Sequence, residues 1–488
     1  MILSVTVSSS DFFTSVILSF KVVGLGSSYV AIRPGYSIHR FIMTNKYQRA
    51  FPVSVFGCFL LAWLILPGHS LAQPANSATG KSPGAAMPTT SKLTPEERQK
   101  RKQARMQKEM EAEQFRVDTF GRVQDDDTNP LAVEYRQAVS EFQKGTAAFS
   151  EAHARLQYRI GEAMSEGARE NWLSSLKKSF QQLVLLRNTG AQLYASDPQK
   201  YVAVGEFLRE MLIADGKLDR FDRWSYAAKA LLSSEVLIDE ELLLYAGYVG
   251  FAECEFDLAK QAWGSLASAG KLPEVELRML QEIPAVEKSW EKELQKLKED
   301  ESKNNPRVEF LTTKGVIEIE LFEDEAPEAV ANMIYLIEMG YYSRKPFFLV
   351  RQHWLAQTGC EKGDGKGTAG FTIRSEAQTQ QSRSHFRGSL AVPVGVNTQT
   401  NELDINTGGA QFYFSFMPLA LLNGKHTVFG RVVDGIEALG MLKVVDLTDE
   451  KVRKDPETRP DTIVSARVLR KRDHKYQPTP VLGRLPKE

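Results

Sequence analysis

The hydrophobic period of this 488-residue chain changes once, close to Pro306, and that change limits the folds it can adopt. Upstream, apolar side chains recur at steps of three and four, as in the series Leu131, Tyr135, Val139 and Phe142. This is the period of amphipathic helices that bury one face. Downstream, apolar and polar residues alternate, which is the period of strands. The sequence therefore predicts a multidomain chain, with an all-α region at 131–300 and a strand-rich domain at 306–472.

The best-marked helical segment runs from Glu241 to Pro273 and reads ELLLYAGYVGFAECEFDLAKQAWGSLASAGKLP. It resembles a tetratricopeptide repeat, with the small Gly247 on a first helix and Ala259 and Trp263 on a second. Two antiparallel helices pack closely where a small residue faces a large one. Only one such repeat is recognisable. We therefore interpret the region as helical-repeat-like, with a generic helical bundle as the alternative.

The N-terminal segment indicates an export signal. A basic stretch after Met43 is followed by an apolar run from Val53 to Leu66 and by Ser70-Leu71-Ala72, whose small residues suit a signal peptidase. We expect translation to start at Met43, cleavage after Ala72, and a periplasmic or secreted mature protein with no stable membrane span. The apolar run is shorter than the about 20 residues of a membrane helix, and an uncleaved N-terminal anchor is the alternative. After this signal region, 1–72, the segment 73–130 is predicted to be a linker and a charged helix.

Composition excludes several classes of partner and cofactor. The chain has 61 basic and 61 acidic residues, and this balance does not favour nucleic acid or an anionic membrane as a partner. Its 3 cysteines are too few and too scattered for a disulfide framework or a zinc site. His353, His385 and His426 lack carboxylate or cysteine neighbours at ligand spacing, so we expect no metal and no other cofactor.

Four blocks of the strand-rich domain, in this order along the chain, carry a family resemblance: GVIEIELFEDEAPEAVANMIYLIEMGYY, GKGTAGFTI, GGAQFYFSF and LNGKHTVFGRVVDG. They resemble the cyclophilins, which are peptidyl-prolyl cis-trans isomerases. The resemblance covers 306–472, leaving 473–488 as a tail. It implies a closed antiparallel β-barrel with capping helices and a substrate groove on its outer face.

The chemistry implied by the resemblance needs few groups. Amide resonance sets a barrier of about 18–20 kcal/mol to rotation of a peptide bond, and exchange at Xaa-Pro bonds takes tens to hundreds of seconds. A catalyst holds the proline ring in an apolar pocket and offers a fixed hydrogen-bond donor to the proline nitrogen of the twisted amide. In the family an arginine supplies that donor, and no acid, base or metal takes part.

The segment FFLVRQHWLAQTGC, residues 347–360, corresponds to the strand that carries this arginine. Gln357 matches the family's catalytic-strand glutamine, and counting back from it places Leu349 at the arginine position. Arg351 comes two residues later, on the same face of a strand but about 6–7 Å away. We interpret Arg351 as a surface residue paired with a carboxylate. The alternative is a displaced catalytic arginine, brought into place by a long reach or a bulge.

The rest of the implied groove is mostly retained. Residues matching the family's substrate-binding positions are Trp354, Leu355, Gln411, Tyr413, Leu421, Leu422 and His426. The family's Met-Ala-Asn is replaced by Val392-Pro393-Val394, which loses an asparagine. The chain also carries an insertion, NTQTNELDINT at 397–407, whose polar composition predicts a surface loop anchored by Leu403 and Ile405.

Together these features predict an exported prolyl isomerase that helps client proteins fold and whose catalysis is weakened at Leu349. The expected partners are proline-containing client polypeptides, with a protein partner on the helical region. Two alternatives stay open: a catalytically silent module that binds proline-containing peptides, or a helical interaction scaffold in which the barrel is only architectural.

Overall fold

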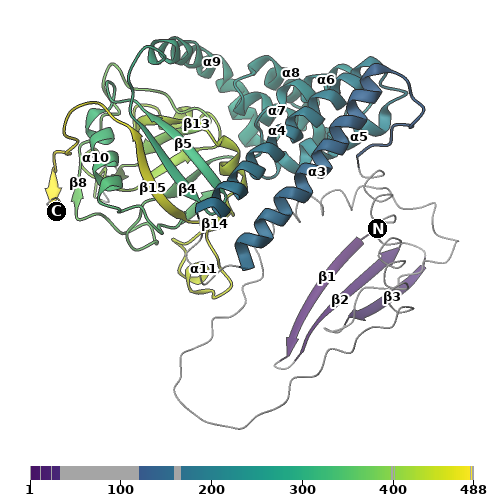
Figure 1. The fold of residues 1–488 in the computed structure, drawn as a ribbon, viewed down its shortest axis with the longest axis horizontal. Coiled ribbons are helices and arrows are strands. Elements are labelled where there is room, and N and C mark those ends of the chain that lie inside the picture. Colours follow the sequence, from purple (N-terminus) through teal and green to yellow (C-terminus); the bar gives the residue numbers. More distant parts are fainter. Residues whose placement is uncertain are drawn as a thin grey trace, which may run out of the picture. The chain divides into compact units, whose positions relative to one another are not determined.

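The computed structural model describes residues 2–10, 13–22, 25–32, 120–158, 166–396, 399–400, 402–483 and 485 (Figure 1). The chain divides into two compact units, Met1–Val55 and Phe56–Glu488. In the first unit, an antiparallel sheet joins β1 (Ile2–Ser10), β2 (Phe13–Val22) and β3 (Leu25–Ile32). The predicted signal segment from Met43 to Ala72 and the predicted charged helix lie outside the described residues.

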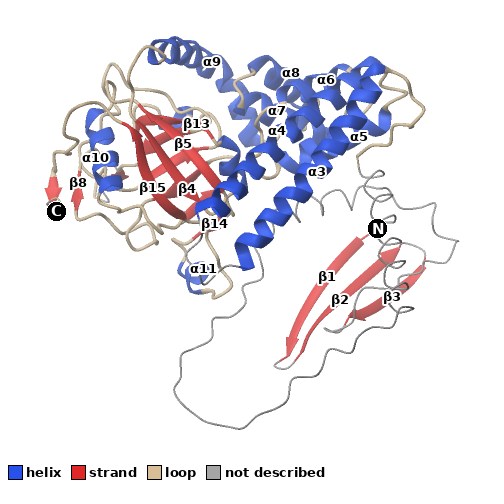
Figure 2. Ribbon diagram, in the orientation of Figure 1, coloured by secondary structure: helices blue, strands red, loops and turns tan. Residues whose placement is uncertain are grey.

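The second unit begins its described part with helices, drawn blue in Figure 2. They are α3 (Pro130–Tyr158), α4 (Glu166–Ser196), α5 (Val202–Gly216), α6 (Ser225–Ser233), α7 (Glu240–Ala252), α8 (Phe256–Ser268) and α9 (Glu274–Asp300). The periodic side chains pack inward as the sequence predicts: Tyr135 and Phe142 of α3 and Leu183 of α4 join one buried cluster. The all-α region at 131–300 is confirmed.

The packing predicted for the segment 241–273 is present in the hairpin of α7 and α8. A Cβ atom on Gly247 would lie 2.0 Å from Nε1 of Trp263, so only glycine fits at this point. A Cβ atom on Gly250 would lie 2.5 Å from the backbone nitrogen of Ala259. The indole of Trp263 is fully buried and donates to the carbonyl oxygen of Leu244. Membership of the tetratricopeptide class stays a prediction.

The helices give way to strands between Asp300 and Arg307, where the period changes. The strands that follow are β4 (Arg307–Thr312), β5 (Gly315–Leu321), β6 (Leu349–Arg351), β7 (Leu355–Thr358), β9 (Ser389–Val392), β12 (Phe412–Ser415), β13 (Thr427–Asp434), β14 (Val445–Asp446) and β15 (Ile463–Arg470). They form one antiparallel sheet in the order β14-β6-β7-β12-β9-β13-β5-β4-β15. The predicted hairpin is β4 and β5, with Ile317, Ile319 and Leu321 fully buried.

The sheet closes through the segments that lead into β6 and β15. The backbone N–H of Phe347 donates to the carbonyl oxygen of Asp461 at 2.8 Å, and that of Ile463 donates to Lys345 at 2.9 Å. These bonds join opposite edges of the sheet, as the predicted closed barrel requires. Its interior holds a separate apolar cluster that includes Phe310, Val350 and Phe414.

One full helix and one short one cap the barrel region. The helix α10 (Pro327–Glu338) begins with a proline at its first turn, and the Glu376 carboxylate accepts the backbone N–H groups of Glu328 and Ala329. The second cap, η3 (Ile436–Met441), is only a 3-10 helix. Within it, Gly440 packs closely on the helical region, because a Cβ there would lie 2.9 Å from the Arg220 side chain. Two further short elements are η2 (Ala420–Leu422) and α11 (Glu450–Lys454).

The insertion and the tail are both attached to the barrel. The insertion contributes to a small hairpin of β10 (Gly395–Val396) and β11 (Leu403–Asp404), and the carbonyl oxygen of Ile405 accepts from Ser375. In the tail, β16 (Leu482–Gly483) pairs with β8 (Phe371–Thr372), and Tyr476 is buried in the barrel cluster. Leu403 and Ile405 are half-buried, in keeping with the predicted anchors.

The helical region and the barrel share apolar contacts. Phe386 and Met417, from the barrel, belong to the buried cluster of the helical region. The rings of Trp290 and Phe386 lie 4.7 Å apart. Within the part of the chain that the structure describes, none of the helices combines the length and the apolar composition that crossing a bilayer requires.

Candidate active site

The segment 347–360, expected as one strand, is a hairpin of β6 and β7. The turn lies at 352–354, where His353 adopts a left-handed φ of 55°. The strand register is regular and places Leu349 directly opposite Gln357, with no bulge between them. Directly opposed residues of an antiparallel pair share a face of the sheet. Leu349, which counting along the sequence aligns with the family's arginine, therefore shares a face of the sheet with Gln357.

A row of side chains runs from Leu349 across five strands. Gln357 is paired with Tyr413 of β12, Tyr413 with Ala391 of β9, and Ala391 with Val428 of β13. Tyr413, Ala391 and Val428 form an apolar cluster with Phe322 and Leu355, and Leu349 and Leu422 pack against it. This cluster is distinct from the one inside the barrel, so it lies on the outer face, where the resemblance implies a groove.

The structure brings most of the predicted site residues together. We call the following set the prolyl face: Leu349, Trp354, Leu355, Gln357, Gln411, Tyr413, Leu421, Leu422 and His426. Leu355 and Tyr413 are buried, whereas Trp354 is 36% exposed and Leu421 is 71% exposed. Leu421 is thus a rim residue that makes no contact with the cluster.

Two glutamines edge the prolyl face. The Nε2 amide of Gln357 donates to Oε1 of Gln411 at 3.0 Å. Gln411 in turn donates to the carbonyl oxygens of Gly365 and Gly367, at 2.9 and 3.0 Å. These bonds fix both carboxamides beside Leu349 and tie the face to the loop at 361–367.

Tyr413, which replaces the family's phenylalanine, connects two histidines beneath the prolyl face. Its hydroxyl lies 2.8 Å from Nε2 of His385 and 2.9 Å from Nδ1 of His426. Oδ1 of Asn423 accepts the backbone N–H of His385 and also lies 2.8 Å from its Nδ1, which must therefore carry a proton. Burial lowers the pKa of both histidines to about 4, so both are neutral near pH 7.

The proton on Nδ1 of His385 fixes which atom donates and which accepts in each hydrogen bond between His385, Tyr413 and His426. Nε2 of His385 is then the acceptor for the Tyr413 hydroxyl, and the Tyr413 oxygen accepts from Nδ1–H of His426. This leaves Nε2 of His426 as an acceptor. No sequence pattern marks His385 as a site residue, because it reaches the prolyl face through the hydroxyl of Tyr413.

Arg351 lies at the edge of the prolyl face, because β6 places it directly opposite Leu355. Its guanidinium donates to the Asp446 carboxylate at 3.0 Å and lies 5.4 Å from the centre of the Trp354 ring. The side chain is 53% exposed. This is the surface ion pair expected for a bystander, and the regular register of β6 provides no bulge that moves Arg351 to position 349.

A cavity of about 160 Å³ lies apart from the prolyl face. It is lined by α3, α4 and the η3 cap, with Phe142, Phe180 and Ile436 among its walls. No residue of the prolyl face lines it, so it takes no part in the chemistry described above. Among the described residues, no group of three metal-ligating side chains could hold an ion.

A closed antiparallel barrel with an apolar, glutamine-edged outer face defines a cyclophilin-type protein. Residues 307–468 match the family described as cyclophilin type peptidyl-prolyl cis-trans isomerase. Through this third of its length, the chain belongs to that family.

Relatives match the same region. A peptidyl-prolyl cis-trans isomerase of Helicobacter pylori is 34% identical over 158 residues, which are 32% of this chain and 91% of that protein. Peptidyl-prolyl cis-trans isomerase B of Bacillus subtilis is 36% identical over 129 residues, covering 26% of this chain and 84% of that protein. A solved structure of a cyclophilin-type isomerase of Cryptosporidium parvum, in the presence of the dipeptide Ala-Pro, is 26% identical in sequence, with a TM-score of 0.27. The match spans 33% of this chain and 98% of that chain.

Proposed function

We propose that this protein binds Xaa-Pro segments of client polypeptides on the prolyl face and isomerises them slowly. The observation that supports the proposal is the pairing of Leu349 with Gln357, which sets an aliphatic side chain beside the glutamine of the prolyl face. The apolar row and the two glutamines support binding. The absence of a donor on Leu349 supports slow turnover.

The expected loss can be sized from the chemistry. In the transition state the proline nitrogen leaves amide conjugation and becomes a hydrogen-bond acceptor. A preorganised donor aimed at developing charge is typically worth about 10²–10³-fold in rate, or roughly 2.7–4 kcal/mol. Leucine supplies no donor. The apolar face still removes water from the amide and orients the ring, so part of the acceleration remains.

A single pair of measurements separates this proposal from its alternatives. The full chain is mixed with a short Ala-Pro peptide, and both binding and cis-trans exchange are followed by NMR. We expect binding together with slow but measurable exchange. Binding without exchange indicates a silent peptide-binding module. Neither binding nor exchange indicates that the barrel serves only as a scaffold for the helical region, where a protein partner is then the main ligand.

Replacing Arg351 by alanine is expected to change the exchange rate by less than about twofold. Its guanidinium is paired with Asp446 at the surface, and the regular register of β6 keeps Arg351 two residues from the position opposite Gln357. The measurement is the exchange rate of one peptide with the native chain and the variant, and Asp446→Asn is the matched control for loss of the pair. A large loss on Arg351→Ala alone identifies Arg351 as the catalytic donor.

We further propose that the mature protein is exported and acts on exported clients, since the stretch after Met43 has the order of a secretory signal. Expression from Met43 in a bacterial host is expected to yield a mature chain that begins at Gln73. N-terminal sequencing of the purified protein checks this. A mature chain that retains the run from Val53 to Leu66 indicates a membrane anchor instead.

A further inference from the structure

Arg387, which precedes β9, joins the helical region to the strand that carries Tyr413. Its guanidinium donates to both carboxylate oxygens of Asp222, at 2.8 and 2.7 Å, and to the carbonyl oxygen of Asp219 at 2.8 Å. Both aspartates lie in the loop 217–224 between α5 and α6. The same guanidinium donates to the carbonyl oxygen of Phe416 at 2.7 Å, directly after β12. One buried cation therefore holds two separate parts of the chain together.

The contacts continue from Phe416 to the prolyl face. The backbone N–H of Phe416 donates to the carbonyl oxygen of Trp354 at 2.9 Å. Trp354 is the aromatic residue at the open edge of the face. A continuous series of hydrogen bonds thus leads from Asp222, through Arg387 and Phe416, to Trp354.

The loop between α5 and α6 also contacts the residue before Trp354. The backbone N–H of His353 donates to the Asp219 carboxylate at 2.7 Å. The His353 ring stacks on Tyr248 of α7, with centres 4.2 Å apart and planes inclined by 13°. His353 has a left-handed φ of 55°, a conformation that costs energy for a residue with a side chain. The contacts from the helical region offset that cost and so stabilise the turn at 352–354.

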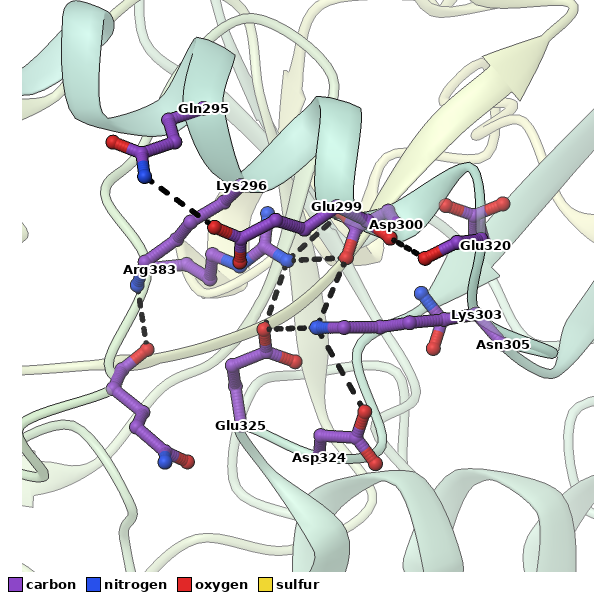
Figure 3. A network of polar contacts seen from close by, with 12 residues as sticks. Gln295, Lys296, Glu299, Asp300, Lys303, Asn305, Glu320, Asp324, Glu325 and Arg383 are labelled. Atoms are coloured by element: carbon purple, nitrogen blue, oxygen red, sulfur yellow. Dashed lines mark hydrogen bonds and ion pairs between the residues drawn. The ribbon is translucent and has the colours of Figure 1, made fainter.

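A second anchor lies four residues before Arg387 and is drawn in Figure 3. The buried guanidinium of Arg383 pairs with Glu293 and Asp300 of α9 and with Glu325, which precedes α10, at 2.7–3.0 Å. Lys303 bridges Asp300 and Glu325 in the same network (Figure 3).

Between the two anchored arginines lies His385, whose ring is bonded to Tyr413 of the prolyl face. The segment Arg383–Arg387 is thus fixed to the helices at both ends and to the prolyl face at its centre. No flexible tether connects the two regions here, and a displacement of the helices must move this segment.

From these contacts we propose that the helical region holds the prolyl face in its binding geometry, with Asp222 and Arg387 as positioning residues. Neither residue touches a proline on the face; both act through Trp354 and Tyr413. The functional consequence rests on the proposed function, since it concerns the same face. The mechanical coupling can be measured whether or not a peptide binds.

The test uses the full chain with Asp222→Ala, which removes the carboxylate that Arg387 holds. Two readouts are recorded: the NMR signals of the Trp354 indole and the His385 and His426 imidazoles, and the affinity for an Ala-Pro peptide. We expect shifted or broadened signals and an affinity lower by roughly tenfold, because loss of one well-packed aromatic anchor commonly weakens binding by about that much. Asp222→Glu, which keeps a carboxylate at this position, is expected to retain part of the native NMR signals and part of the native affinity.

The matched control is Lys177→Ala. Lys177 and Asp434 also pair across the two regions, at 2.7 Å, but their side chains are 59% and 55% exposed and contact neither Arg387 nor Trp354. This variant is expected to leave the signals and the affinity as in the native chain. If it changes them as much as Asp222→Ala does, the effect is general loosening and the proposal is wrong.

Each remaining outcome also decides whether the helical region positions the prolyl face. A folded Asp222→Ala chain with native signals and native affinity contradicts the proposal. If this variant does not fold, Arg387→Lys, which keeps the charge but loses the paired contact with Asp222, is measured by the same criteria. If the native chain binds no peptide, the proposed function fails, and the indole and imidazole signals alone decide whether the helices position the face.

Discussion

Arg383→Ala is expected to lower the free energy of unfolding by roughly 3–5 kcal/mol, the usual cost of removing one partner from a buried ion pair. The Arg383 side chain has no exposed surface, and neither has that of Asp300. Without the guanidinium, the carboxylates of Glu293, Asp300 and Glu325 stay buried together and lose the cation that all three share. Their mutual repulsion and lost hydration then act against the folded state.

The loss is expected to depend on pH. Burial already raises the pKa of Glu293 in the native chain although Arg383 acts to lower it, so removal of that cation is expected to raise the pKa of Glu293 further. A carboxyl group whose pKa is raised in the folded state destabilises the fold as pH rises through that pKa. The free energy of unfolding of the variant is therefore expected to fall further below the native value at pH 7.5 than at pH 4.5. Urea unfolding at both pH values measures this.

Arg467→Ala, which removes a 64% exposed partner of Glu309, is the control and is expected to cost less than about 1 kcal/mol. A control-sized loss for Arg383→Ala at both pH values contradicts the account.

The features that could be predicted from the sequence are those that depend on residues close together in the chain. Strict alternation in the hairpin of β4 and β5 requires one register, because a slip by one residue exposes the buried side chains. The proline and the acidic residues before and within the first turn of α10 mark where that helix begins. The position of Leu349 also follows from local counting, since a regular hairpin fixes which residue faces Gln357.

The features that could not be predicted depend on partners far apart in the chain. Arg387 and Asp222 are separated by 165 residues, and Arg383 and Asp300 by 83. No periodicity marks such pairs. The polar boundary near Pro306 therefore indicated where helices give way to strands, but it did not indicate that the helical region and the barrel share buried contacts. The close approach of Gly440 to Arg220 of the helical region likewise joins residues far apart in the chain.

Leu349→Arg is expected to raise the rate of prolyl isomerisation by tenfold or more. The substitution places a guanidinium opposite Gln357, from which it can donate to the nitrogen of the twisted amide. A perfectly aligned donor is worth about 10²–10³-fold, and an introduced one, without evolved support, is expected to regain only part of this. The gain should appear in kcat rather than in KM, since the donor acts on the transition state.

The site can accept the longer side chain. Leu349 is half-buried and packs against the outer cluster, so an arginine can lay its methylene groups along Leu355 and Leu422 and keep its charged end accessible. Val444→Arg is the matched control. Val444 is 51% exposed and directly precedes β14, the neighbour of β6, so it adds the same charge outside the prolyl face. This control is expected to leave the rate unchanged.

We propose that leucine occupies the donor position of this cyclophilin-type domain. The decisive measurement is the cis-trans exchange rate of one Ala-Pro peptide with the native chain, Leu349→Arg and Arg351→Ala at equal concentrations. We expect slow exchange with the native chain, at least about tenfold faster exchange with Leu349→Arg, and no substantial change with Arg351→Ala. Native exchange as fast as in arginine-containing relatives, abolished by Arg351→Ala and not improved by Leu349→Arg, would contradict it.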